Sequence, residues 1–139
     1  MIFIDSSSLI KKYFAEAGSE KIIKIMEKAS QIVISPITYI EIINAIQRYY
    51  KTAVISKEHR DEIWKNIEFD FQYFTKITLN EILEYQCKCF LKEDNIHLKS
   101  LDLIQLTAAK YAQCNLFITS DEKLYQAASK QIKKTELIR

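Results

Sequence analysis

The sequence alternates between very short apolar runs and much longer stretches of mixed polarity. The clearest runs are IFI (2–4), QIVIS (31–35) and NLFIT (115–119). Each run is apolar at consecutive positions, which is typical of strands covered on both faces of a parallel sheet. Helical stretches separate the runs, as parallel strands with right-handed crossovers require. The alternation therefore predicts an α/β fold with helices on both faces of a parallel sheet.

Capping residues and helical spacing predict the remaining elements. We expect helices over 8–15, 19–29, 36–51, 57–73, 101–113 and 121–129, one more from the 78–81 capping box to about 93, and two weaker strands over 74–78 and 133–138. The expected helix starts are Ser35 with Pro36 in the first turn, Ser56, Thr78 in a capping box with Glu81, and Ser100. Glycine and proline occur once each, so short turns should connect the elements.

Length and composition fit a single domain over residues 1–139, because domains usually hold ~100–200 residues. A hydrophobic fraction of 48% with 27% charged residues is enough for a core. No apolar run approaches ~18 residues, and residues 1–4 are too short for the core of a signal peptide. We therefore expect a cytoplasmic protein. The three cysteines are an odd number and predict free thiols, and the net charge of +2 favours polyanions only weakly.

Four carboxylates lie in apolar surroundings, unlike most of the acidic residues. They are Asp5 after MIFI, Glu41 within ITYIEIINAI, Asp102 within SLDLIQLTAA and Asp121 after NLFITS. The aspartates also fit a second interpretation, since Asp5 and Asp121 can cap helices and Asp102 suits a first helical turn. Glu41 shares a helical stripe with Asn44 and Arg48, which faces either water or a polar cleft.

Together the four carboxylates indicate a metal site. Asp5 and Asp121 follow strands, and ligands of open parallel sheets bind beyond the carboxyl ends of strands where the strand order reverses. Glu41 and Asp102, early in their helices, can face the same crevice. Carboxylates this close repel one another, and a divalent cation removes the repulsion. Oxygen ligands select Mg²⁺ or Mn²⁺, so the hypothesis is metal-assisted phosphodiester hydrolysis.

Two hydroxyl groups accompany these carboxylates. Ser7 and Thr119 can hold the waters of a metal ion or orient its ligands, and they can equally cap helices. His59 and His97 lie in polar segments without a partner at ligand spacing, so surface positions are expected for both.

The motifs also resemble those of a known family. MIFIDSSSLIKKYFAE, SPITYIEIINAIQR, LKSLDLIQLTAA and NLFITSDEKLYQAA, in this order, resemble the four motifs of PIN-domain nucleases, and among them the VapC-type toxins of toxin–antitoxin pairs. The resemblance covers essentially the whole chain and places Asp5, Glu41, Asp102 and Asp121 at the acidic positions, with Ser7 and Thr119 beside them. Gln105 is a departure, because similar proteins often carry a histidine there; we expect it to affect only local substrate contacts.

The resemblance implies an α/β/α sandwich with a parallel sheet of five strands. It also implies a ribonuclease that depends on Mg²⁺ or Mn²⁺, is commonly a homodimer, and is inhibited by a cognate antitoxin. Candidate phosphate contacts for RNA are Lys11, Lys12, Lys92, Lys99 and Lys123. Antitoxins of this family dock along helices where this chain carries ten of its 16 aromatic residues, between Tyr39 and Phe90. We therefore expect some of these rings to be exposed.

Two other functions remain open. A phosphotransfer protein also carries an aspartate after its first strand, as the nucleophile, but Glu41 and Asp102 would then have no role. A non-catalytic nucleic-acid or protein-binding module would keep the carboxylates for stability alone, and Mg²⁺ or Mn²⁺ would not raise its melting temperature.

Overall fold

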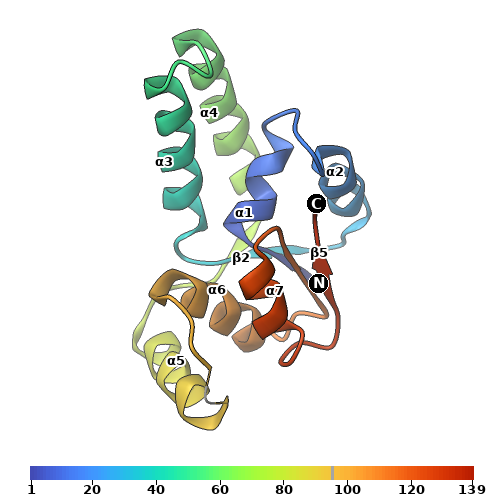
Figure 1. The fold of residues 1–139 in the computed structure, drawn as a ribbon, viewed down its shortest axis with the longest axis vertical. Coiled ribbons are helices and arrows are strands. Elements are labelled where there is room, and N and C mark those ends of the chain that lie inside the picture. The colour runs from blue at the N-terminus through green and yellow to red at the C-terminus, as the bar shows by residue number, and fades with distance from the viewer. Residues whose placement is uncertain (95) are drawn as a thin grey trace.

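Five parallel strands form one sheet in the computed structural model, which describes residues 1–94 and 96–139 (Figure 1). The strands are β1 (Ile2–Ile4), β2 (Ile32–Ile34), β3 (Thr75–Lys76), β4 (Leu116–Thr119) and β5 (Thr135–Leu137). Their order is β3-β2-β1-β4-β5, and every neighbouring pair is parallel. The structure therefore confirms the predicted α/β class, including both strands with weak sequence signals.

Helices connect these strands in the expected alternation. They are α1 (Ser6–Leu9), continued by the 3₁₀ turn η1 (Ile10–Lys12), then α2 (Ser19–Lys28), α3 (Thr38–Lys51), α4 (Lys57–Phe71), α5 (Glu81–Asp94), α6 (Ser100–Tyr111) and α7 (Glu122–Ala128). The first of these helices is shorter than expected and turns into a 3₁₀ helix before ending at Lys12. The sole glycine, Gly18, precedes α2 with a φ of 91°, a conformation that glycine adopts readily.

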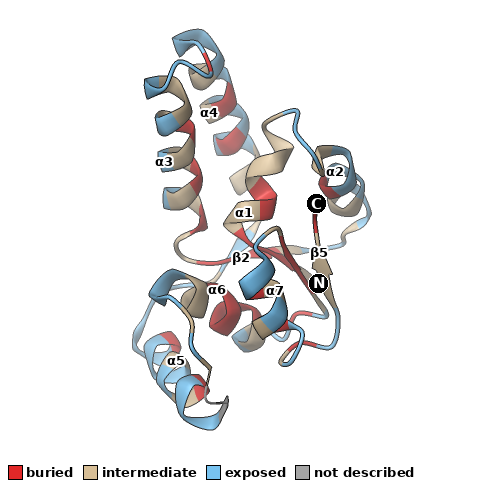
Figure 2. Cartoon of the chain, viewed as in Figure 1, coloured by how far each residue is buried: buried red, intermediate tan, exposed pale blue. Residues whose placement is uncertain are grey.

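The strands separate two hydrophobic cores, as a three-layer sandwich requires. Successive side chains of a strand point to opposite faces, so Phe3 and Phe117 stack in one core, 5.2 Å apart, and their neighbours Ile4 and Ile118 lie in the other. The first core is completed by residues of α5, α6 and α7, and the second by residues of α1, α2, α3 and α4. Most residues of β1, β2 and β4 are buried between these helices, whereas β5 is only half-buried (Figure 2) and β3 is exposed.

Three predicted helix starts are wrong by one or two residues. Helix α3 begins at Thr38, so Pro36 lies in a turn and Ser35 is not the N-cap. Asn80, not Thr78, caps α5, since its side chain accepts a hydrogen bond from the Leu83 amide at 3.0 Å. Lys99 occupies the N-cap of α6, which makes Ser100 the first helical residue. The Ser56 cap is confirmed, with a hydrogen bond from the His59 amide at 3.1 Å.

The strand order reverses between β1 and β4, the two central neighbours. From β1 the chain proceeds to β2 and β3 on one side, and β4 and β5 lie on the other. Asp5 follows β1, and Ser120 and Asp121 follow β4, so both chain segments leave the sheet at the same carboxyl edge. This is the place where open parallel sheets bind ligands.

The α3–α4 hairpin extends beyond the sheet (Figure 1). Aromatic side chains on it and after it are exposed. Phe69 of α4 and Tyr73 after it are 60% and 69% exposed, and Tyr85 of α5 is also exposed. The expectation of exposed rings between Tyr39 and Phe90 is confirmed. Among the described residues, no helix is both long and apolar enough to cross a membrane.

Candidate active site

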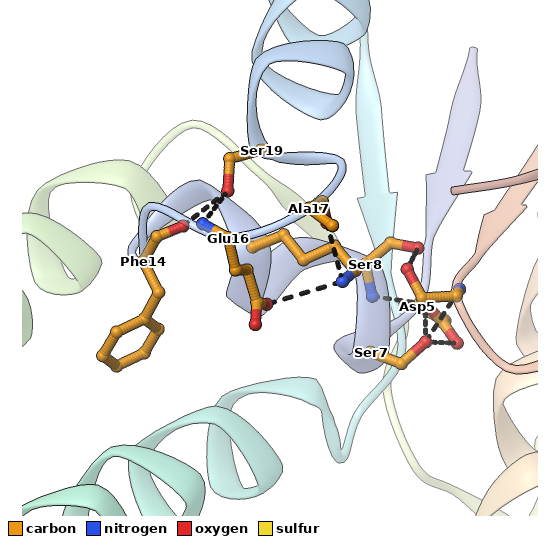
Figure 3. Close-up of polar contacts among 9 residues, drawn as sticks. Asp5, Ser7, Ser8, Phe14, Glu16, Ala17 and Ser19 are labelled. Carbon is orange, nitrogen blue, oxygen red and sulfur yellow. Dashed lines mark hydrogen bonds and ion pairs between the residues drawn. The ribbon is translucent and has the colours of Figure 1, made fainter. Parts of the chain in front are cut away.

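Asp5 is a buried carboxylate held by three neighbouring residues. Its side chain is only 3% exposed. It accepts hydrogen bonds from the Thr119 hydroxyl at 2.6 Å, from the Ser7 hydroxyl at 2.8 and 2.9 Å, and from the Ser8 amide at 2.9 Å. Figure 3 shows Ser7 and Asp5 side by side at the end of β1. The Ser8 contact makes Asp5 the N-cap of α1, so the capping interpretation holds and does not exclude a second role.

The environment of Asp5 raises its pKa to about 6. Burial is the main cause, because a low-dielectric surrounding disfavours the charged form. The hydrogen bonds from Thr119, Ser7 and Ser8 lower the pKa and only partly offset the burial. The fold therefore places a carboxylate where its negative charge is incompletely compensated.

Thr119 and Ser7 connect Asp5 to the segment after β4. Besides donating to Asp5, the Thr119 hydroxyl accepts a hydrogen bond from the Asp121 amide at 3.0 Å. The Ser7 hydroxyl accepts one from the Ser120 amide at 2.9 Å. Both hydroxyl groups singled out from the sequence thus contact the first acidic residue and fix the two strand ends relative to each other.

Asp121 is exposed and caps α7. Its carboxylate accepts a hydrogen bond from the Leu124 amide at 2.8 Å, in agreement with the capping interpretation. This bond orients the side chain at the edge of the sheet and leaves it open to solvent.

Glu41 lies in the first turn of α3, closer to the helix start than the sequence predicted. One carboxylate oxygen, Oε1, accepts hydrogen bonds from the Ser6 hydroxyl at 2.7 Å and from the Gln105 side-chain amide at 2.8 Å. A negative charge in a first turn is also stabilised by the helix dipole. Glu41 is therefore held by α1 and α6 as well as by its own helix.

Asp102, in the first turn of α6, responds to two of the other carboxylates. Its pKa is raised, first by partial burial, then by the negative charges of Asp121 and Glu41, while Lys99 lowers it. Like charges raise a carboxyl pKa only when they are near. Asp121 and Glu41 therefore lie close enough to Asp102 for their charges to raise its pKa.

A groove of about 480 Å³ runs along the stripe of α3 that begins with Glu41. Glu41, Asn44 and Arg48 line it together with Ser6 and Ser7 of α1. The polar stripe of α3 therefore faces a cleft, which decides between the two alternatives left open by the sequence. An arginine and an asparagine next to acidic side chains give this groove both anion-binding and cation-binding groups.

The donor set fits a hard divalent cation in its chemistry. The converging groups are carboxylate oxygens with nearby hydroxyls, and the raised pKa values of Asp5 and Asp102 mark negative charge that a cation would stabilise. Among the described residues, no three His, Cys, Asp or Glu side chains gather closely enough to surround an ion by themselves. Such a set suits Mg²⁺, which keeps several of its waters and uses few direct protein ligands.

Ser6 and Gln105 are site residues whose contacts the sequence did not predict. The sequence points to Ser7 rather than to its neighbour Ser6, and it predicts only local substrate contacts for Gln105. The structure places both on Glu41. The helical spacing of Gln105 from Asp102, three residues, was a usable signal because it puts both side chains on one face of α6. His59 and His97 are exposed, as expected.

Solved structures with this fold include bacterial toxin components. VapC20 from Mycobacterium tuberculosis, described as a toxin that cleaves the sarcin–ricin loop, is 13% identical, with a TM-score of 0.68 over 91% of this chain and 95% of its own. VapBC2 from Rickettsia felis is 13% identical, with a TM-score of 0.69 over the whole of both chains. VapBC-1 from nontypeable Haemophilus influenzae is 19% identical, with a TM-score of 0.68 over 99% and 98%.

No curated protein sequence matches the chain. The family model of the PIN domain, in contrast, matches residues 2–130, which include all four acidic positions and the complete switch point of the sheet. The chain therefore belongs to the PIN domain family.

Proposed function

We propose that the protein is an endoribonuclease that depends on Mg²⁺ or Mn²⁺ and acts as the toxin of a toxin–antitoxin pair. The observation that supports the proposal is the buried Asp5 carboxylate at the switch point, whose pKa is raised to about 6. Asp102, whose pKa is raised by burial and by the charges of Asp121 and Glu41, supports it as well. A protein gains nothing in stability from charges arranged in this way unless a cation binds them. Membership of the PIN family supports the same chemistry.

The chain's own residues would divide the work between binding and positioning. A bound cation would polarise a phosphate oxygen and activate a water molecule. Asp5, Glu41, Asp102 and Asp121 are the proposed metal-binding and catalytic residues. Ser7 and Thr119 hold the Asp5 carboxylate by hydrogen bonds at 2.6–2.9 Å.

RNA would approach along the groove of α3. Arg48 lines that groove and can pair with a phosphate. Of the lysines predicted to contact RNA, Lys99 lies near enough to Asp102 to lower its pKa. Lys12 pairs with Asp70, and Lys11 with Glu16 and the Ala17 carbonyl, so these two are partly occupied within the chain. Lys92 and Lys123 are exposed.

An RNA cleavage assay with Mg²⁺, Mn²⁺ or EDTA tests the proposal. The purified protein should cleave with either metal and not with EDTA, and Asp102→Asn should abolish cleavage without unfolding the protein. Glu58→Gln is the matched control, because Glu58 is also an acidic residue in a first helical turn but lies on α4. Cleavage by Asp102→Asn at the wild-type rate, or cleavage in EDTA, would overturn the proposal. A non-catalytic binding module would instead show neither cleavage nor a metal-induced rise in melting temperature.

The regulatory part of the proposal concerns an antitoxin that docks on the α3–α4 hairpin. An apolar groove of about 640 Å³ lies there, lined by Tyr39, Ile43, Trp64 and Phe69. Structures with this fold include one described as a toxin–antitoxin complex from Klebsiella pneumoniae. The test is to express this chain with a small protein encoded by a neighbouring gene. Co-purification, loss of cleavage and a change in the fluorescence of Trp64, the only tryptophan, are expected; unchanged cleavage would contradict regulation by that protein.

We also propose that the enzyme is a homodimer and works in the cytoplasm, where its RNA substrate is found. Exposed apolar side chains on α5, such as Ile82 and Tyr85, support a second copy as partner. Light scattering of the purified protein should give twice the mass of 16.4 kDa, and a monomer at all concentrations would contradict this part.

A further inference from the structure

Gln105 forms a closed set of hydrogen bonds with Glu41 and Ser6. Its side-chain nitrogen donates to Glu41 Oε1 at 2.8 Å and to the Ser6 hydroxyl at 2.7 Å. The Ser6 hydroxyl in turn donates to the same Glu41 oxygen at 2.7 Å. Three elements, α1, α3 and α6, thus meet at a single carboxylate oxygen.

The orientation of the Gln105 amide follows from its neighbours. A carboxylate accepts hydrogen bonds and cannot donate, so the NH₂ group and not the carbonyl must face Glu41. The carbonyl oxygen of Gln105 is then buried, and it has no hydrogen-bond partner among the described residues. The side chain is 3% exposed. Leaving a buried acceptor unpaired lowers stability. An apolar side chain of similar size at this position would therefore make the folded protein more stable.

The contacts leave the second oxygen of Glu41 uncommitted. Within the part of the chain that the structure describes, Oε2 accepts no hydrogen bond, whereas Oε1 accepts two. A carboxylate fixed in this way cannot rotate freely, and it presents one defined oxygen for a ligand. Gln105 also follows Asp102 by three residues on α6, so a single helix positions two acidic side chains of the site.

We propose that Gln105, with Ser6, is a positioning residue that holds Glu41 by one oxygen and leaves the other for the divalent cation. The inference rests on the proposed function, since it needs a metal at this edge of the sheet. Hydrogen-bond partners of metal ligands typically contribute ~10–100-fold to metal affinity or activity. Gln105 therefore acts through Glu41 and needs no contact with the RNA.

The test measures Mn²⁺ binding by calorimetry in the metal-free protein, together with RNA cleavage. Gln105→Met keeps the size of the side chain and removes both donors. We expect the Kd for Mn²⁺ to rise ~10–100-fold, and kcat to fall with little change in KM. Thr107→Val is the matched control, because Thr107 is equally buried on α6 and its side-chain oxygen has no hydrogen-bond partner, Glu41 included, among the described residues. It should bind Mn²⁺ as the wild type does.

A double-mutant cycle separates positioning from a general structural effect. If Gln105 acts through Glu41, then Gln105→Met should weaken Mn²⁺ binding in the wild type but add nothing in the Glu41→Gln background. Additive effects would overturn the inference. Ser6→Ala is a second variant that removes one donor without a large void, and it should raise the Kd several-fold whether or not Gln105→Met folds.

The outcomes distinguish this inference from the proposed function. If the wild type binds Mn²⁺ and cleaves RNA, and Gln105→Met and Ser6→Ala bind Mn²⁺ within twofold of it, only the role of Gln105 is wrong. If Gln105→Met does not fold and Ser6→Ala binds like the wild type, the positioning role is wrong as well. If the wild type binds no Mn²⁺ while Thr107→Val and the wild type are both folded, the proposed function and this inference both fail.

Discussion

The edge of the sheet and the α3–α4 hairpin differ in which side chains they bury. The edge buries a charged side chain, whereas the hairpin exposes apolar aromatic rings. At the edge, the charged Asp5 is 3% exposed. On the hairpin, the aromatic Phe69 is 60% exposed. Charged groups are rarely buried without a partner, and large rings are usually covered. The same chain thus buries a charge in one region and exposes apolar rings in the other.

The buried charge and the exposed rings each lower the stability of the isolated chain. A different kind of ligand would restore the stability in each region. A cation stabilises buried carboxylates through its charge. A protein surface covers exposed rings and removes their apolar area from water. If the proposed function is right, the edge of the sheet binds a cation for catalysis and the hairpin binds an antitoxin for regulation. The predictions that follow test whether the two regions behave independently.

The largest expected effect comes from Asp5→Asn. Asparagine has nearly the same shape but no charge, so it should remove a proposed metal ligand and lower RNA cleavage by more than the ~10–100-fold typical of a ligand's hydrogen-bond partner. Asp61→Asn, a change of the same kind on the hairpin, should leave cleavage by the purified protein unchanged. A radiolabelled RNA assay in Mn²⁺ measures both. Equal loss in the two variants would mean that the two regions are not independent.

Asp5→Asn should also change stability, in a direction that depends on pH. The pKa of Asp5 is raised from 3.8 to about 6 in the folded protein. Its contribution to stability is therefore complete below pH ~4 and is lost as the pH rises toward 6. The difference of about two pKa units corresponds to about 3 kcal/mol. Without metal, Asp5→Asn should then be more stable than the wild type at pH 7.5, and similar to it at pH 4.

Urea unfolding at pH 4 and pH 7.5 measures this difference. Mn²⁺ should stabilise the wild type more than Asp5→Asn at pH 7.5, because the cation compensates the buried charge. A wild type that is more stable than Asp5→Asn at pH 7.5 without metal would show that the hydrogen bonds of Asp5 outweigh its burial.

Thr119→Val should have a smaller effect on cleavage. The Thr119 hydroxyl donates to Asp5 at 2.6 Å and lowers its pKa. Valine removes this donor, so we expect cleavage to fall ~10–100-fold and the acidic limb of the pH–rate profile to move to higher pH. Thr52→Val, on the exposed end of the hairpin, should change neither quantity. An unshifted pH profile in Thr119→Val would show that the hydroxyl does not act through Asp5.

Most of the fold was predictable because its signals are local. Runs such as IFI and LFI are apolar at every position, and the structure buries most of their residues between the helices on both faces of the sheet. Helix starts were less predictable, because several residues near each start can supply a cap. Asn80 and Thr78 are both good capping residues, and only the path of the chain after β3 decides between them.

The candidate site was predictable where it follows strands and less so where helices meet. Asp5 and Asp121 follow strands that the sequence predicts, β1 and β4, although only the structure shows that these two strands pair. The contacts of Gln105 with Glu41 and Ser6 join residues 64 and 99 positions apart. They depend on how α6 turns against α3 and α1, which no local pattern specifies. The sequence therefore indicates the acidic residues and the two hydroxyls that hold Asp5, but not the groups that hold Glu41.

The smallest expected effect comes from Phe69→Ser on the hairpin. Phe69 is 60% exposed and packs against the Tyr73 ring, with ring centroids 5.3 Å apart, so its loss should cost at most ~1 kcal/mol of stability. Ile67→Ala, two residues earlier on the same helix but fully buried, should cost ~2–5 kcal/mol. Phe69→Ser should cleave RNA at the wild-type rate and lose inhibition by a co-expressed antitoxin. If it is as unstable as Ile67→Ala, the ring is part of the core, and exposure no longer marks the hairpin as a binding region.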